Sequence, residues 1–234
     1  AFLISLGIPT LFLGIIAVIF LIVKKTGQKL FGKRNLALFE IKASGSSKEA
    51  TGKLTDWLCD FKAPFVLEIA AHDVGSETHF YVGVKERYGE TLTNKITEIW
   101  PGAKVEKAEA YTIFNTQGDT RAYYVKKTAE LGGADPFPAI FEKFSKIEIA
   151  GEGMAMQIIV KPKKMQVNIR LLASALSSYR AEELMHDLRT AFPTTLSTTE
   201  SKRPKEFIGS FIERNFDESQ ATVISKEDLA SIWG

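Results

Sequence analysis

The sequence has little of what a secreted or metal-dependent protein would carry. Its 234 residues include one cysteine, Cys59, and three histidines. A single cysteine permits no disulfide within the chain, whereas a large secreted domain would more often carry paired cysteines. Cys59 lies between Leu58 and Phe61 near an apolar face, so we expect it to pack and not to react. The paired C-x-x-C and H-E-x-x-H motifs of zinc sites are missing as well.

Common catalytic motifs are also absent. No G-x-x-x-x-G-K-[ST] loop is present to cradle nucleotide phosphates, and no G-x-S-x-G carries a nucleophile. Gly132 and Gly133 could offer amides to an anion before a helix, but a flexible turn is the simpler interpretation. One hairpin gathers four residues that could meet a metal: His72, Asp73, Glu77 and His79. Spacing fixes no further ligand there, so we predict no metal site. Because the motifs above are missing, we also predict no catalytic residue and no cofactor.

The first twenty-three residues contain no charged side chain. A helix of that length rises roughly 34 Å, enough to cross a hydrocarbon core of about 30 Å. A secretory signal would place positive charge before the apolar run, but here the charge follows it. The basic residues that come before the first acid are Lys24, Lys25, Lys29, Lys33 and Arg34. The sequence therefore predicts a single-pass protein of the inner or plasma membrane, with its N-terminus outside and the rest cytoplasmic.

The lipid bilayer is thus the first predicted partner, and the basic cluster can also touch anionic headgroups. This cluster accounts for the positive net charge of +2. Without its five residues, twenty-five basic residues face twenty-eight acidic ones, which leaves a net charge of about −3 on the globular part. A basic footprint over the whole domain, as expected for nucleic-acid binding, is therefore absent.

The globular part begins with an alternation of strands and helices. After a strand over 39–42, Ser46-x-x-Glu49 has the form of a capping box. Apolar residues then recur at helical spacing: Ala50, Leu54, Trp57, Leu58 and Phe61. The elements that follow are a strand over 65–71, a strand over 80–84, a helix over 92–100 that Pro101 stops, and a strand over 103–113. The order βαββαβ is that of a ferredoxin-like domain.

The same order then recurs. Strands are predicted over 122–128, 154–161, 165–175 and 206–216, with helices starting near 135 and 179. Both helices follow their counterparts, near 46 and 90, by 89 residues. The helix near 135 carries Phe137, Ile140, Phe141, Phe144 and Ile147 on one face. The residues predicted to be core are Trp57, Leu58, Phe61, Phe141 and Phe144.

The fold class is therefore predicted as α+β, with an N-terminal transmembrane helix and two tandem ferredoxin-like domains. The predicted divisions are a span over 1–23, a basic linker over 24–35, domains over 36–116 and 117–218, and a terminal segment over 219–234. A single larger mixed domain is the alternative. In the terminal segment, Ser225-x-x-Asp228 caps a short helix. That helix is a candidate for docking on a partner through Leu229, Ile232 and Trp233.

Two basic runs are candidate contacts for nucleic acid or a partner. Their members, with one nearby arginine, are Lys161, Lys163, Lys164, Arg170, Lys202, Arg203 and Lys205. Each run could touch a phosphate backbone, although solvated charge beside a turn is the more common case. The strand over 79–84 does not match the aromatic signature of RNA-recognition modules. Nucleic acid is therefore a candidate partner that the sequence does not favour.

Three stretches resemble a known family. Residues 151–162 resemble a recurring passage in which a "GE" pair precedes an IQI-like strand that ends in proline. Residues 167–175 resemble the "VNIR" strand of the same family, and residues 225–233 resemble the domain boundary that follows this strand. All three passages belong to the membrane-proximal region of TraG-like type IV secretion and conjugation ATPases. In that family, the region precedes a hexameric motor. This sequence departs from the pattern because it lacks the motor and the helical insertion expected between Lys164 and Met165.

The resemblance implies a membrane-anchoring and assembly module of a type IV secretion or conjugation-like coupling ATPase complex, non-catalytic in itself. The expected protein partners are further copies of the chain or other subunits of the membrane complex. The alternative is a stand-alone membrane-tethered scaffold or sensor subunit of a larger complex.

Overall fold

The computed structural model describes residues 36–43, 48–72, 78–108, 111 and 118–234. The chain divides after Asn35, and residues 36–234 form one compact unit. The predicted boundary between 116 and 117 therefore does not separate two compact units.

The expected single-pass membrane topology is corrected by the structure. Among the residues that it describes, no helix is long and apolar enough to cross a bilayer. The predicted span over 1–23 and the basic linker over 24–35 lie outside the described residues. The described residues thus give no support to the predicted location in the inner or plasma membrane with an external N-terminus.

The fold is α+β, and its first twelve strands and helices follow the predicted alternation. The first half contains β1 (Ala37–Lys42), α2 (Lys48–Asp60), β2 (Phe65–Ala71), β3 (His79–Val84), α3 (Gly89–Ile99) and β4 (Lys104–Ala108). The second half contains β5 (Asp119–Lys127), α4 (Phe137–Phe144), β6 (Gly153–Lys161), β7 (Gln166–Ala175), α5 (Ser178–Thr190) and β8 (Leu196–Glu200). The helices α2 and α4 begin 89 residues apart, as do α3 and α5. The predicted repeat of helices is thus confirmed.

Both halves share one antiparallel sheet with the strand order β4-β1-β3-β2-β6-β7-β5-β8. The halves meet where β2 pairs with β6 along its whole length, from Phe65 opposite Val160 to Ala71 opposite Met154. The prediction of two tandem ferredoxin-like domains is therefore wrong. Two such domains would each keep their own sheet, whereas here the pairing of β2 with β6 makes the sheet and its core continuous.

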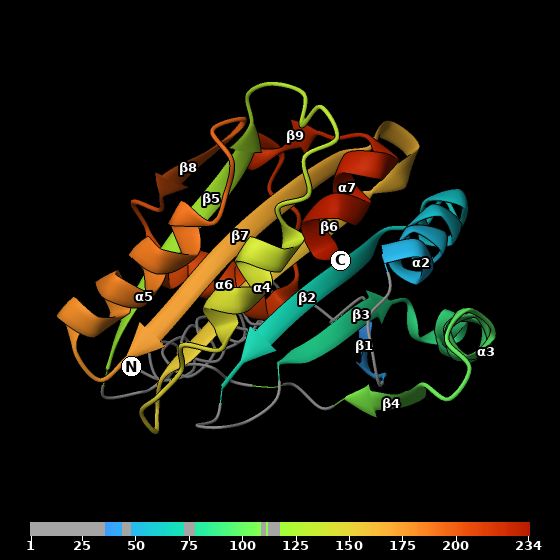
Figure 1. Cartoon of the computed structure of the whole chain (residues 1–234), viewed down its shortest axis with the longest axis horizontal. Coiled ribbons are helices and arrows are strands. Elements are labelled where there is room, and N and C mark those ends of the chain that lie inside the picture. The colour runs from blue at the N-terminus through green and yellow to red at the C-terminus, as the bar shows by residue number, and fades with distance from the viewer. Residues whose placement is uncertain (1–35, 44–47, 73–77, 109–110, 112–117) are drawn as a thin grey trace, which may run out of the picture. The chain divides into compact units, whose positions relative to one another are not determined.

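The sheet is covered on both faces (Figure 1). On one face, the helices α2, α3, α4 and α5 pack over a core that runs through both halves. A helix after β8, α6 (Pro204–Glu213), covers the other face, where Phe207 and Phe211 are buried against β2, β5, β6 and β7. Strands buried on both faces lose the polar alternation of a half-exposed sheet, and all seven residues of β2 are buried.

The segment at 206–216 is helical, which corrects the sequence prediction of a closing strand there. The closing strand is β8, which ends before Pro204. Proline is favoured in the first turn of a helix, and Phe207 and Phe211 are spaced four apart, so that both reach the sheet from one face of α6. After a turn, β9 (Thr222–Val223) adds to the start of β7 and leads into α7 (Lys226–Trp233).

The predicted core is partly confirmed. Leu58 and Phe144 are buried, and Trp57 and Phe61 are half-buried. Phe141 is 39% exposed, so its assignment to the core is wrong. Phe144 points from the last turn of α4 into the shared core. Phe141 instead faces a cavity on the side of the sheet that α2 to α5 cover.

The buried Cys59 gives a first prediction. Burial raises the pKa of its thiol to about 11 from an ordinary value of 9.0. Since only the thiolate attacks a disulfide reagent, Cys59 should react at pH near 8 roughly a hundredfold more slowly in the folded chain than in urea. The measurement is the rate of colour release from dithionitrobenzoate. Equal rates in both states would show that α2 does not bury this thiol.

Candidate functional site

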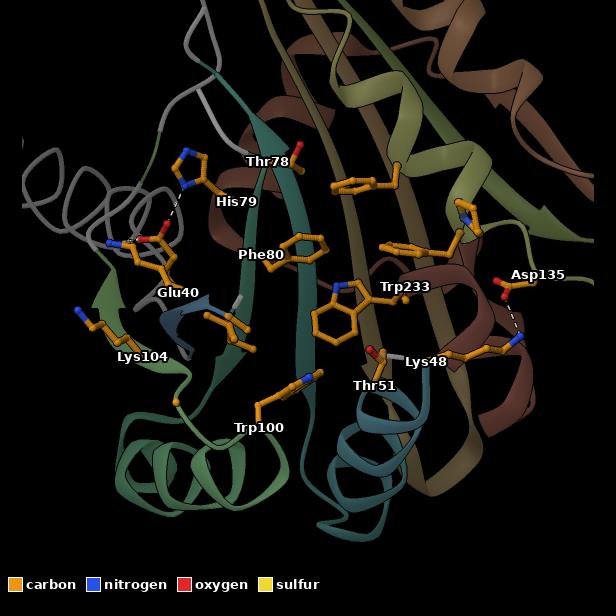
Figure 2. Close-up of a pocket in the computed structure, with 18 residues that line it drawn as sticks. Glu40, Lys48, Thr51, Thr78, His79, Phe80, Trp100, Lys104, Asp135 and Trp233 are labelled. Carbon is orange, nitrogen blue, oxygen red and sulfur yellow. Dashed lines mark hydrogen bonds and ion pairs between the residues drawn. The ribbon is translucent and has the colours of Figure 1, made fainter. Parts of the chain in front are cut away.

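A cavity of about 1030 Å³ opens in the first half, on the face of the sheet that α2, α3, α4 and α5 cover (Figure 2). Its floor is formed by Ile41 of β1 and Phe80 of β3, and its walls come from α2, α4, α7 and the turn between α3 and β4. The cavity therefore draws side chains from both halves of the chain. We refer to it as the aromatic pocket, because five aromatic side chains line it. Those rings are Phe80, Trp100, Phe137, Phe141 and Trp233.

Four of the five rings touch one another. The centroid of Phe80 lies 5.8 Å from that of Phe141 in a stacked pair, and 6.2 Å from that of Trp233 in an edge-on pair. Phe137 stacks on Phe141 at 5.6 Å. These separations and angles are those that aromatic quadrupoles favour. The rings thus form one continuous apolar wall, with Trp100 set below Phe80 and Trp233 in Figure 2.

Local sequence explains how these rings arrive at one place. Phe137 and Phe141 are four residues apart on α4 and so lie on one face of the helix. Trp233 sits in the last turn of α7, whose first turn is capped by the Ser225 hydroxyl accepting from the Asp228 amide at 3.0 Å. Lys127 of β5 then fixes that end of α7 through a 2.8 Å ion pair with Asp228.

Besides His79 Nε2, two further polar atoms of the pocket residues have no partner among the described residues. They are the indole nitrogens Nε1 of Trp100 and Trp233, both shielded from solvent. Trp233 as a whole is 3% exposed. A buried donor without an acceptor destabilises a protein by about 1–3 kcal/mol. Such groups are uncommon in folded proteins, and these two lie where solvent does not reach them.

The charged residues around the pocket are largely paired with each other. Lys48 bridges to Asp135 at 2.7 Å and thereby joins the start of α2 to the segment before α4. Glu40 bonds His79 Nδ1 at 2.6 Å and lies 3.5 Å from the Lys42 ammonium. Strand alternation directs Glu40 and Lys42 away from the side of the sheet that carries Ile41. The helix-side part of the pocket is therefore apolar, with unpartnered donors and no unpaired carboxylate among its described residues.

A second cluster of polar groups lies under α6 and serves the fold. The buried Glu68 carboxylate accepts two bonds from Arg214, at 2.8 and 3.0 Å, and one from the Tyr111 hydroxyl at 2.8 Å. Gln157 donates to Glu68 at 2.8 Å and accepts from Arg170 at 3.1 Å. Burial, then the adjacent Glu68, raises the pKa of Tyr111 well above its usual range. These contacts tie α6 and the segment after it to the middle of the sheet.

The structure separates the basic residues that the sequence grouped as contact candidates. Arg170 is fully buried, and burial lowers the pKa of its guanidinium, so it is not available as a surface contact. Lys161 pairs with Glu218 and lies 4.0 Å from the centre of the Phe216 ring. Arg203 pairs with Glu206 at 3.2 Å. The exposed members are Lys163, Lys164, Lys202, Arg203 and Lys205.

Strand register places the two basic runs apart. Lys161 lies opposite Gln166 at the start of β7, while Glu200, just before the second run, lies opposite Tyr123, which in turn faces Leu171. Five residues of strand span roughly 17 Å. The runs therefore do not form one basic surface. The membrane-surface candidates Lys24, Lys25, Lys29, Lys33 and Arg34 lie outside the described residues.

The candidate docking helix packs on its own chain. Leu229, Ile232 and Trp233 are buried in the core shared by α2 and α4. Lys226 also pairs with Asp60 at the end of α2, at 2.7 Å. The apolar face that the sequence offered to a partner is thus used internally. Trp233 also lines the aromatic pocket.

The candidate metal cluster is not assembled in the described part of the chain. The rings of His72 and His79 stack at 4.6 Å, and Glu40 engages His79. Asp73 and Glu77 lie outside the described residues. Within the described ranges, no group of three or more ligating side chains could hold a metal ion.

No protein-family model and no curated protein matches the sequence. Similar solved structures include CrmK, described as a flavoenzyme involved in shunt product recycling in caerulomycin biosynthesis. The TM-score is 0.42 at 7% sequence identity, and the match covers 68% of this chain and 42% of CrmK. Another is a chitooligosaccharide oxidase, with a TM-score of 0.42, 9% identity and coverage of 79% and 53%. The chain thus spans about half, or less, of their lengths. Likeness at this level supports no statement about reaction or cofactor.

Two further expectations find no support in these comparisons. Both proteins are described as enzymes, so the prediction of a non-catalytic chain finds no support in these comparisons. The comparisons also contain nothing that indicates type IV secretion or conjugation. The resemblance to TraG-like proteins itself stays a prediction.

Sequence reasoning missed the aromatic pocket. Phe137, Phe141 and Phe144 share helical spacing, which predicts a common face but does not tell which of them reaches the core. The sequence places Trp100 at the end of the helix predicted over 92–100 and offers Trp233 only as a docking residue. The pocket aromatics come from segments far apart in the sequence, so only the tertiary arrangement brings them together.

Proposed function

We propose that the chain is a binding module that takes part in assembling a larger complex, and that the aromatic pocket is its working site. The observation that carries this proposal is a half-open cavity of about 1030 Å³ walled by rings from both halves of the chain. Soluble proteins rarely leave such apolar surface open without a ligand. The buried Trp233 and the half-buried Trp100 beside an exposed phenylalanine resemble the anchor sites on which binding energy concentrates.

Two other features support the same role. The exposed Phe141 lines the pocket, where it is available to a ligand while the fold rests on Phe144. Assembly is also what the family resemblance implies for this region. A basic surface for nucleic acid receives less support, since the exposed lysines and Arg203 fall into two separate runs.

The proposal is tested with the full chain and the aromatic fluorophore anilinonaphthalene sulfonate. The dye should bind saturably in the pocket, and Phe141→Ser should weaken that binding by about tenfold, which corresponds to about 1.4 kcal/mol. Tyr179→Ser is the matched control, because Tyr179 is 80% exposed and does not line the pocket. Equal binding by both variants, or no saturable binding by the wild-type chain, would contradict the proposal.

A further inference from the structure

The strand β4 is the edge of the sheet in the first half (Figure 1). It pairs with β1 on one side, and no described strand pairs with its other side. Its residues alternate between the two faces of the sheet. Val105 packs against the core under α2 to α5, while Lys104 and Glu106 are exposed on the opposite face. Backbone N–H and C=O groups on the outer side of such a strand are a template for a further strand.

The charges of β4 are poorly matched by β1. In the ladder, Lys104 lies opposite Lys42, and Glu106 lies opposite Glu40. Like charges directly opposite each other destabilise a sheet. Lys42 reaches diagonally to Glu106 at 2.8 Å, so this acid gains a counter-charge, but Lys104 still faces a cation. An acid from beyond the outer edge would give Lys104 the opposite charge that β1 does not supply.

A second copy of β4 can supply that acid in one register. Charged residues on an edge strand usually prevent pairing, because a second strand brings like charges together. For two antiparallel copies of β4, this holds when the symmetry axis lies at Lys104, Glu106 or Lys107, since each would face its own copy. With the axis at Val105, the two valines meet, and Lys104 of each copy lies opposite Glu106 of the other on the same face. Among these four registers, only this one sets opposite charges against each other.

We propose that two copies of this chain associate through β4, antiparallel about Val105, and so continue the sheet from one copy into the other. This inference does not depend on the aromatic pocket. The interface is isologous, as in most homodimers, and each copy supplies the same five-residue strand. Its area is small, so the dimer is weak and forms at high micromolar protein concentration. Because the axis stands perpendicular to the sheet, the two aromatic pockets open on the same side of the joined sheet.

Sedimentation equilibrium of the full chain over a concentration series tests the association. Lys104→Glu and Glu106→Lys each turn two attractive pairs into two repulsive ones, so each variant alone should weaken the dimer by about tenfold. An equimolar mixture of the two variants should restore it, because two acids then face two lysines. Both side chains are exposed, so neither substitution should disturb the fold. Glu200→Lys makes the same charge change on β8, the opposite edge strand, and should leave the dimer unchanged.

The register is tested with Val105→Cys. Two copies of this variant would place their thiols directly opposite each other, within the Cα separation of about 4.4–6.8 Å that a disulfide needs. Diamide should therefore link the two copies. Lys107→Cys is the matched control, because its two thiols are displaced by four residues along the strands, roughly 13 Å, and should stay unlinked. The wild-type chain, whose buried cysteine is Cys59, should give no link either.

Several outcomes would overturn this inference. The first is a wild-type chain that stays monomeric throughout the concentration series. The second is a dimer that Lys104→Glu and Glu106→Lys leave unchanged, or that their mixture does not restore. Linking of Lys107→Cys as readily as Val105→Cys would contradict the register. A dimer that only Glu200→Lys weakens would place the contact on β8 instead of β4.

Discussion

Replacing Arg214 with methionine is expected to lower the free energy of unfolding by about 3–5 kcal/mol. Arg214 makes the bidentate contact to Glu68, and the carboxylate is fully buried. Methionine fills a similar volume but leaves the Glu68 charge in the interior with only neutral donors from Tyr111 and Gln157. The loss is large because an unpaired buried charge keeps its desolvation penalty after its partner is gone.

Urea denaturation of the full chain measures this effect, and Arg203→Met is the matched control. Arg203 makes a 3.2 Å ion pair with Glu206, but both side chains are exposed, so the control should change the stability by less than about 1 kcal/mol. Adding Glu68→Gln to Arg214→Met removes the stranded charge and should recover part of the loss. Similar midpoints for Arg214→Met and Arg203→Met would show that the network under α6 does not hold the fold together.

Replacing Phe144 with alanine should destabilise the fold by about 3–5 kcal/mol, whereas Phe141→Ala should do so by less than about 1 kcal/mol. The two phenylalanines are three residues apart on α4, but Phe144 is 1% exposed and Phe141 39%. Removing the Phe144 ring leaves a cavity in the core shared by both halves. Phe141→Ala opens only the wall of the pocket, and alanine favours the helix.

The pair is informative because the two sites have the same residue type, helix and substitution. For a domain of this size, the Phe144→Ala loss corresponds to a fall in melting temperature of roughly 10 °C, readable by circular dichroism. A fall of equal size for Phe141→Ala would place that ring in the core, as the sequence pattern alone predicts. It would also remove the aromatic pocket as a free surface.

Helices and their repeat could be predicted because their signals are local. Apolar residues at helical spacing placed α2, α4 and α5 correctly, and the Ser225 cap predicted the start of α7. The segment at 206–216 was misassigned, although Phe207 and Phe211 are spaced as on a helix and Pro204 is a typical helix start. A short apolar run fits a strand or a helix, and here only packing on the sheet decides.

The joining of the two halves could not be predicted from alternation. In β2, the alternating residues Phe65, Leu67 and Ile69 indicate one buried face, which is correct. The other face carries Val66 and Ala70, which α6 and its surroundings bury, so the strand is apolar on both sides. Such a run predicts a central strand but does not tell which strand pairs with it. Each residue of β2 lies at least 83 positions along the sequence from its partner in β6.

The same limit applies to the candidate site. Charge runs and terminal apolar residues were the visible features of the sequence, but Arg170 and Trp233 both turn inward. The pocket depends on where α4 and α7 pack relative to β3, and no local pattern encodes that.

The edge-to-edge pairing of β2 with β6 also bears on how the chain folds as it leaves the ribosome. Once the first half has emerged, the outer edge of β2 must wait for a strand encoded about ninety residues later. At typical rates of synthesis, this interval lasts roughly 5 to 20 s. During it, an apolar strand with unpaired N–H and C=O groups is exposed to any neighbouring chain, the usual starting point of misassembly. Newly made first halves are therefore the species for which a chaperone that shields strand edges would matter most.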